Sequence, residues 1–273
     1  MRYPFLLLSL MVCGGWAVAP GQNRYKGNPV TAEDLTPTQG DRSGPYPWKV
    51  GIVTTIFWVG ERPGGHNPVA NRSSAWDQHW SAHYGGYDSP DPAARRSYIP
   101  VRFVPRQNPF YFALPYNDVV GHHTKREAAW VIPWFRETFV RDGQSVLKDR
   151  WIAIRHGDRV CYAQWEDCGP FRTDHWQYVF GPERPRPNLN QGAGLDVSPA
   201  VRDYLGLAPT RDVCDWKFVA FTEVPSGPWL RYGQSRRYVL ARSSKGRSIR
   251  RPRHAVLAHR RAQGKRMKRH AAA

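Results

Sequence analysis

The chain has 273 residues, with 12 Trp, 13 Tyr, 11 Phe, 24 Gly and 24 Pro, a composition typical of β-structure with many turns rather than of a helical bundle. Its formal net charge of +18 is uneven, because fourteen of the 40 lysines and arginines, but none of the 22 acids, come after residue 235. The length allows one sizeable, mildly basic domain with extensions, the last of them strongly basic.

The N-terminal segment, residues 1–19, has the pattern of a secretory signal peptide. Arg2 supplies the positive charge, residues 5–12 form the apolar region, and residues 17–19 are a small-residue cleavage site. The apolar run is well short of the roughly 20 residues that span a bilayer, so we expect an exported protein with no transmembrane segment. The sequence leaves open whether Cys13 is lipidated.

The next part of the chain alternates between loops and short strands. Residues 20–48 lack apolar periodicity and predict a flexible leader. Residues 49–59 are rich in β-branched and aromatic side chains, which indicates the first strand. A long polar and aromatic excursion follows over 60–100, and the apolar runs 101–104 and 110–114 are two further strand candidates.

The middle of the chain favours helical turns and then a hairpin. Residues 122–143 are interrupted by Pro133, so we expect short helical turns rather than one helix. Residues 151–154 and 160–164 are strands, and the sequence His-Gly-Asp at 156–158 predicts the hairpin turn between them.

The last predicted elements are a short helix and a strand. Ser198 is a good N-cap, Pro199 suits the first helical position, and Gly206 suits the position after the helix. Residues 216–224 alternate between apolar and polar side chains, which predicts a strand. The basic tail, residues 234–273, has no core-forming pattern and is predicted to be disordered.

Two acidic residues lie at the ends of a predicted strand and of a short apolar run. Asp167 ends a strand and begins an Asp-x-Gly-Pro-Phe turn, and Asp196 lies in a hydrophobic-Asp-hydrophobic-Ser sequence before the short helix that ends in Leu-Gly. This paired motif, within 150–219, resembles the double-psi β-barrel of the rare lipoprotein A family. Related barrels occur in expansins, in the lytic transglycosylase A type and in family 45 endoglucanases. The resemblance implies a mainly β fold over 49–233: a six-stranded double-psi β-barrel with long loop insertions and a short helix.

The resemblance also implies catalytic residues. Carried over, Asp196 faces the groove as a general acid and Asp167 lies near it. Cleavage of a glycosidic bond needs a carboxylic acid to protonate the leaving oxygen, and two close carboxylates raise the pKa of one of them. Asp118, which follows an early strand, is a third candidate. The alternative is structural, with Asp167 and Asp118 forming turns and Asp196 capping the helix.

Candidate substrate-binding residues surround the acids in sequence. Trp165, Trp176 and Tyr178 flank them, and Asn190 lies in the Pro/Asn-rich loop between them. Aromatic faces stack on sugar rings and polar loops complete a glycan groove. The alternative for each aromatic residue is packing of the large loops over a small barrel.

The cysteines are candidates for a disulfide, and the histidines are candidates for a metal site. We predict a disulfide between Cys168 and Cys214, with Cys161–Cys168 as the rival pair, because export permits disulfides. His79 and His83 are four residues apart, but no third ligand accompanies them, so we expect neither a metal nor a cofactor.

These features predict an exported protein of the periplasm, cell envelope or extracellular space that binds a peptidoglycan-like cell-wall polysaccharide. It acts either as a lytic transglycosylase-like enzyme with Asp196 as general acid or as an expansin-like wall-binding module without turnover. The third alternative is a structural envelope protein. The basic tail predicts adherence to anionic envelope polymers or lipid headgroups. Export and the lack of interleaved aromatic residues argue against nucleic acid.

Overall fold

The computed structural model describes residues 46–65 and 67–233. The predicted signal peptide with Cys13, nearly all of the predicted leader and the basic tail lie outside the described residues, and nothing further is concluded about their structure. Within the described ranges, no helix is both long enough and apolar enough to cross a membrane.

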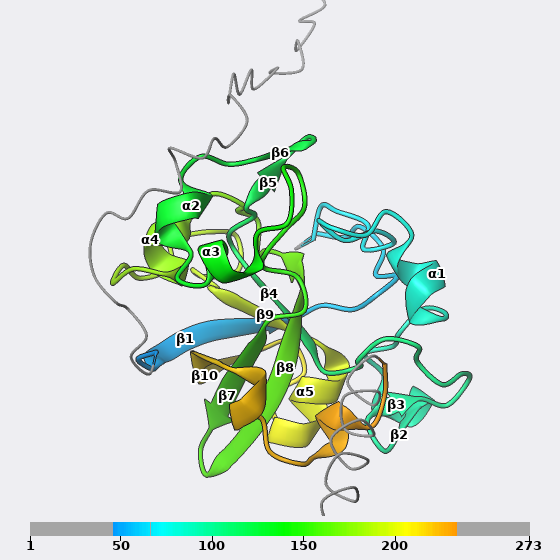
Figure 1. Cartoon of the computed structure of the whole chain (residues 1–273). Coiled ribbons are helices and arrows are strands. Elements are labelled where there is room, and N and C mark those ends of the chain that lie inside the picture. Colours follow the sequence, from blue (N-terminus) through cyan, green and yellow to red (C-terminus); the bar gives the residue numbers. More distant parts are fainter. Residues whose placement is uncertain (1–45, 66, 234–273) are drawn as a thin grey trace, which may run out of the picture.

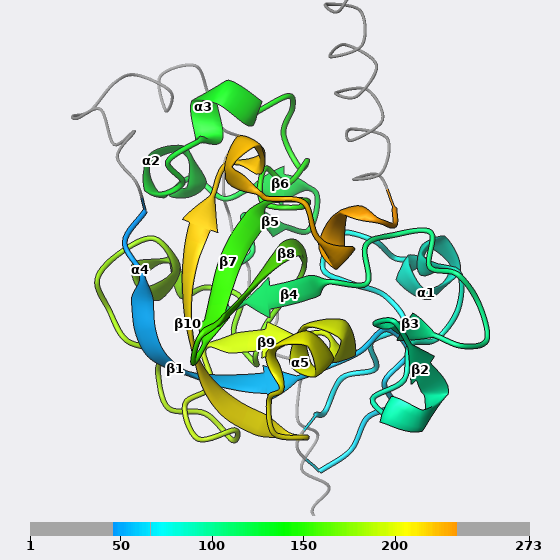
Figure 2. The same cartoon turned by 90° about the horizontal axis from the view of Figure 1, so that it is seen from below.

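Six strands of the described chain close into a barrel in the order β1-β10-β7-β8-β4-β9 (Figures 1 and 2). The pairs β1–β9 and β4–β8 are parallel and the other four are antiparallel. The predicted fold, a mainly β six-stranded barrel with long loop insertions and a short helix, is confirmed. The strands are β1 Lys49–Ile56, β4 Tyr111–Leu114, β7 Trp151–His156, β8 Arg159–Cys168, β9 Leu195–Val197 and β10 Arg211–Val219.

The connections carry the remaining elements. The hairpin between β7 and β8 and the short helical turns after residue 122 are present as predicted, and α5 packs beside β8. These elements are α1 Trp80–Tyr84, η2 Pro92–Ala94, β2 Arg95–Arg96, β3 Ile99–Pro100, β5 Val119–Val120, β6 His123–Thr124, α2 Ala128–Val131, α3 Phe135–Thr138, α4 Trp176–Val179, α5 Pro199–Leu205, η3 Phe221–Glu223 and η4 Pro228–Leu230.

One predicted strand is wrong. Residues 101–104 are not extended into a sheet, and Val101 and Val104 are 57% and 66% exposed. Pro100 and Pro105 flank this segment, and proline has no N–H to give to a ladder. The last strand also differs from its prediction, because β10 begins at Arg211 and ends at Val219.

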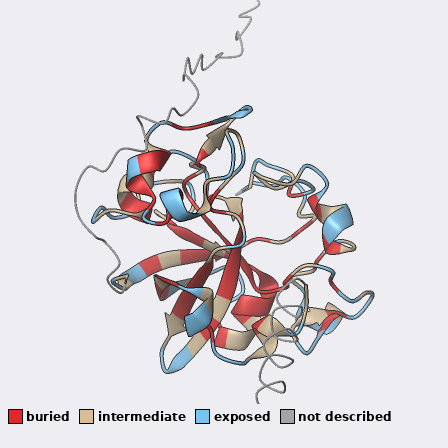
Figure 3. Cartoon of the chain, in the orientation of Figure 1, coloured by how far each residue is buried: buried red, intermediate tan, exposed pale blue. Residues whose placement is uncertain are grey.

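Buried and less buried residues alternate along parts of the barrel strands, as expected where one face of a strand is turned to a core (Figure 3). Leu195 and Val197 are fully buried in the central core, whereas Asp196 between them is half-buried. The helix α5 follows at once. The Ser198 hydroxyl accepts from the N–H of Val201 at 3.3 Å, and Gly206 ends the helix with φ +71°, as the capping pattern predicts.

The insertion between β1 and β4 packs on the outer face of the barrel. Its buried aromatics Trp80 and Tyr84 contact Tyr111 of β4, with ring centroids 5.3 and 5.9 Å apart. The hydroxyls of Tyr84 and Tyr111 donate to the buried carboxylate of Asp88, which also pairs with the Arg95 guanidinium. This second apolar cluster holds the insertion beside the strands that carry the candidate acids.

The predicted disulfide is wrong, because Cys161, Cys168 and Cys214 are all free thiols. Cys161 and Cys214 are buried in the core inside the barrel. Cys168 ends β8, and its S–H donates to the carbonyl of Tyr116 at 3.2 Å. Its thiol therefore contacts the backbone of the segment after β4 rather than either predicted cysteine partner.

Candidate functional site

Strand register places the two motif acids in one row across the outer face of the barrel. Asp196 of β9 pairs with Ala113 of β4, and Ala113 pairs on its other side with Asp167 of β8. On the opposite side Asp196 pairs with Thr55 of β1, which pairs with Arg211 of β10. Directly paired residues point to the same face of a sheet. The row therefore runs Arg211–Thr55–Asp196–Ala113–Asp167.

A bulge in β8 determines which acid joins this row. Phe112 pairs with Trp165, but the next residue, Ala113, pairs with Asp167, so Glu166 is the extra residue. In a regular ladder Ala113 would oppose Glu166. The bulge instead leaves Glu166 buried against Lys148, with 3.0 Å between the carboxylate and the ammonium nitrogen, and directs Asp167 outward.

A cavity of about 800 Å³ covers the row. All five residues of the row line it, together with the first part of the insertion, the Gly-Pro-Phe turn and the loop before β9. The aromatic lining comes from Phe57, Trp58 and Phe171. Phe171 is 40% exposed and Leu189 is 72% exposed, so the rim presents apolar surface to a ligand.

The side chain of Asp196 is bound by β1 and lies beside the Gly-Pro-Phe turn. The Thr55 hydroxyl donates to its Oδ1, and a methyl group built on Gly169 would lie 3.5 Å from its Oδ2. Burial raises the pKa of Asp196 from 3.8 to about 6. This carboxyl therefore keeps its proton to a much higher pH than an exposed aspartate does.

Asp167 fastens the insertion to the barrel. Its Oδ1 accepts the backbone N–H groups of Ala75 and Cys168, each at 2.8 Å. Burial raises its pKa to about 7 against the lowering effect of these hydrogen bonds, and the charge of Asp196 adds to the increase. Asp167 is thus both a structural anchor and a titrating neighbour of Asp196.

Glu61 is a third carboxylate in the cavity, and the sequence analysis did not single it out. The buried Asn71 side chain donates to its Oε2 at 2.9 Å, and Asn67 supplies a further hydrogen bond. Burial raises the pKa of Glu61 to about 7, and Asp196 contributes to that increase through its charge. The local signal, a glutamate after Phe-Trp-Val-Gly, is too general to identify it from the sequence.

Two predicted site residues lie elsewhere. Asp118 does not line the cavity; it is buried, accepts from the Ser145 hydroxyl and the Val146 N–H at 2.7 Å each, and organises its own loop. Burial raises its pKa to about 6, against the lowering effect of these hydrogen bonds. Trp176 is half-buried against the barrel core and also lies outside the cavity lining.

Two predicted sugar-binding aromatics are core residues instead. Trp165 is fully buried, and its ring stacks on Phe112 with centroids 5.7 Å apart. Tyr178 is also fully buried, and its hydroxyl accepts from the indole N–H of Trp216 at 2.8 Å. Their side chains point into the barrel, so neither reaches a ligand on the outer face. Asn190, by contrast, lines the cavity.

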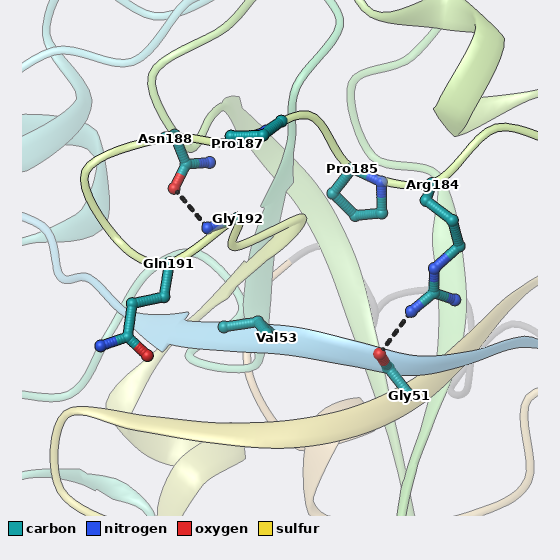
Figure 4. Close-up of a pocket in the computed structure, with 8 residues that line it drawn as sticks. All are labelled: Gly51, Val53, Arg184, Pro185, Pro187, Asn188, Gln191 and Gly192. Carbon is teal, nitrogen blue, oxygen red and sulfur yellow. Dashed lines mark hydrogen bonds between the residues drawn. The ribbon is translucent and has the colours of Figure 1, made fainter.

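The loop that carries Asn190 is braced against the barrel (Figure 4). Arg184 donates to the carbonyls of Val50 and Gly51, and the side chain of Asn188 accepts from the N–H of Gly192 at 3.1 Å. A smaller cavity of about 270 Å³ lies between this loop and β1. These bonds fix the loop that forms one wall of the larger cavity.

No protein-family model matches the chain, and no curated protein matches it either. In the parts of the chain described by the structure, no group of three or more His, Cys, Asp or Glu is placed to hold a metal ion. The cavity contains carboxyl groups whose pKa values are raised by burial. Three of them, with pKa values of about 6 to 7, can donate or accept a proton near neutral pH.

Proposed function

We propose that this protein binds a cell-wall polysaccharide in the outer cavity and cleaves it with Asp196 as general acid, in the manner of a lytic transglycosylase. The observation that carries the proposal is the position of Asp196 at the centre of the row, inside an 800 Å³ cavity with an apolar rim. Its raised pKa supports the same role, because a general acid must hold a proton at working pH.

The reaction needs only one carboxyl group. Asp196 gives its proton to the glycosidic oxygen as the bond between that oxygen and the anomeric carbon breaks. The resulting carboxylate then takes the proton of the 6-hydroxyl of the same sugar, and that oxygen closes onto the anomeric carbon. Asp196 ends protonated, no water is consumed, and the product is an anhydro sugar.

The lining of the cavity fits an extended glycan. Trp58 and Phe171 offer aromatic faces for sugar rings, and the side chain of Asn190 offers a donor and an acceptor for hydroxyl groups. Ala113, the smallest side chain of the row, leaves room between Asp196 and Asp167. A chain of sugars that follows the row would meet both acids in turn.

The paired motif also supports a family assignment. We propose a double-psi barrel of the rare lipoprotein A type, and two observations support it: the barrel has six strands, and both halves of the motif line one cavity on its outer face. The pattern of residues 1–19 supports export to the periplasm, cell envelope or extracellular space. The tail after residue 235, with fourteen basic residues and no acid, supports adherence to anionic envelope polymers or lipid headgroups.

The test is release of soluble fragments from insoluble peptidoglycan by the purified protein, compared with Asp196→Asn. Release by the wild type and loss of release in the variant, with binding to the insoluble glycan retained, is the expected result. Equal release by both proteins would remove Asp196 from the mechanism. Binding without release by either would favour the expansin-like alternative, for which the exposed apolar rim is sufficient.

A further inference from the structure

One end of the row is basic. Arg211 pairs with Thr55, and Thr55 pairs with Asp196, so Arg211 lies two strands away from Asp196 on the side opposite Asp167. At the usual strand spacing this places the Cα atoms of Arg211 and Asp196 about 10 Å apart. Arg62 reaches the same cavity from the insertion. Two guanidinium groups therefore lie on a surface whose other charged members are acids.

In the described part of the chain, the side chains of Arg211 and Arg62 are not engaged by other protein groups. Both are exposed, and within residues 46–65 and 67–233 neither has an ion pair or a side-chain hydrogen bond. Other arginines of the same region are engaged: Arg95 and Arg202 both bind Asp203, and Arg155 binds Asp215 at 2.6 Å. The two cavity arginines thus keep their donors for a ligand.

We propose that Arg211 and Arg62 form a subsite for a carboxylate group of the bound glycan, so that the substrate is an acidic polysaccharide. This inference rests on the proposed function, because it places a glycan along the row. The planar guanidinium group matches a carboxylate with two parallel hydrogen bonds, which a lysine does not reproduce. A neutral glycan would leave both guanidinium groups without a partner.

The acids of the cavity do not prevent such a ligand from binding. Burial raises the pKa of Asp196 to about 6 and those of Asp167 and Glu61 to about 7, so at pH 6 the last two are largely protonated and Asp196 is about half protonated. The two guanidinium groups then outweigh the negative charge of the carboxyl groups that line the cavity. The row is therefore polarised along the direction of the bound chain.

Two sources of a sugar carboxylate share this chemistry: a uronic acid ring and a lactyl ether on an amino sugar. The probes are an oligogalacturonate hexamer for the first, a peptide-free peptidoglycan strand for the second, and an N-acetylglucosamine hexamer as the neutral reference. Binding is measured by calorimetry at pH 6 with the full chain carrying Asp196→Asn, so that cleavage does not consume the probe.

The variants are Arg211→Gln and Arg62→Gln, each added to that chain. The matched control is Arg96→Gln, because Arg96 is exposed on β2 and does not line the cavity. Arg211→Gln is expected to weaken binding of at least one acidic probe about tenfold or more, with the neutral probe and the control unaffected. Rising salt should weaken the acidic complex in the parent chain and much less in Arg211→Gln.

The acidic probe whose affinity falls in Arg211→Gln identifies the source of the carboxylate. Equal affinity of the parent chain for acidic and neutral probes would overturn the subsite, as would equal weakening of both by Arg211→Gln. If the wild type cleaves neutral and acidic chains alike, the subsite is refuted and the proposed function stands. If acidic chains bind through Arg211 but are never cleaved, the subsite stands and the catalytic proposal is refuted.

Discussion

Replacing Asp196 by asparagine is expected to stabilise the folded protein at neutral pH while abolishing glycan cleavage. Burial raises the pKa of this carboxyl from 3.8 to about 6. Since each pKa unit corresponds to about 1.4 kcal/mol, ionised Asp196 lowers the free energy of unfolding by at most about 3 kcal/mol. Asparagine keeps the shape, and its Oδ1 still accepts from the Thr55 hydroxyl, so the variant avoids this cost.

The pH dependence of stability follows from the number of protons that Asp196 holds in the folded and in the unfolded chain. The unfolded chain loses the Asp196 proton near pH 4 and the folded protein near pH 6, so the folded protein holds the extra proton between these values. Stability from this group is therefore lost as the pH rises from 4 to 6. The Asp196→Asn variant has no such loss, and its advantage over the wild type should grow by up to about 3 kcal/mol between pH 4 and pH 8.

The assay is urea unfolding of both proteins at pH 4, 6 and 8, read by tryptophan fluorescence. Asp212→Asn is the matched control. Burial raises the pKa of Asp212, but the N–H groups of Ala208 and Val213 outweigh it and hold that pKa below its usual value. The control should therefore lose stability relative to wild type as the pH rises through the carboxylate range. A difference between Asp196→Asn and wild type that does not change with pH would refute the reasoning.

Three further substitutions probe the surroundings of Asp196. Glu61→Gln removes a negative charge that interacts with Asp196, so the pKa of Asp196 should fall and the basic limb of the pH–rate profile for cleavage should move to lower pH. An unmoved limb would show that the two groups do not interact. Gly169→Ala adds a methyl group at 3.5 Å from Asp196 Oδ2, an ordinary contact distance, and the added desolvation should move the same limb to higher pH with the fold retained; a shift to lower pH would contradict this. Ala113→Val narrows the space between Asp196 and Asp167 and should weaken glycan binding at least tenfold. The larger side chain should also lower the free energy of unfolding, measured with urea, by roughly 1 to 3 kcal/mol. Unchanged binding would place the glycan elsewhere.

The sequence was informative where the relevant signals are local. The hairpin between β7 and β8 and the capped helix α5 follow from turn and capping residues, and the position of Asp196 in the outer cavity agrees with what the resemblance implies. The burial of Trp165 could also have been predicted from the sequence, because Trp165 shares the inward face of β8 with Cys161 and Ala163. Period two along that strand predicts a core residue rather than a sugar-binding one.

The rest of the site depends on contacts between distant segments. A regular ladder would place Asp167 on the same inward face as Trp165, and only the bulge at Glu166 turns it outward. Glu61 joins the cavity because the insertion packs back on the barrel through its own aromatic cluster. Asp118, in contrast, lies outside the cavity and is hydrogen-bonded to Ser145, which is 27 residues away in the sequence. No local pattern carries this information.

The most direct test of the account is the structure of the Asp196→Asn variant with a wall oligosaccharide bound. We predict a glycan that lies along the row from Arg211 to Asp167, with a glycosidic oxygen within hydrogen-bond distance of the side chain at position 196. A ring should stack on Trp58 or Phe171. A glycan bound in the smaller cavity beside Arg184, or anywhere else on the surface, would contradict the assignment of the outer row as the functional site.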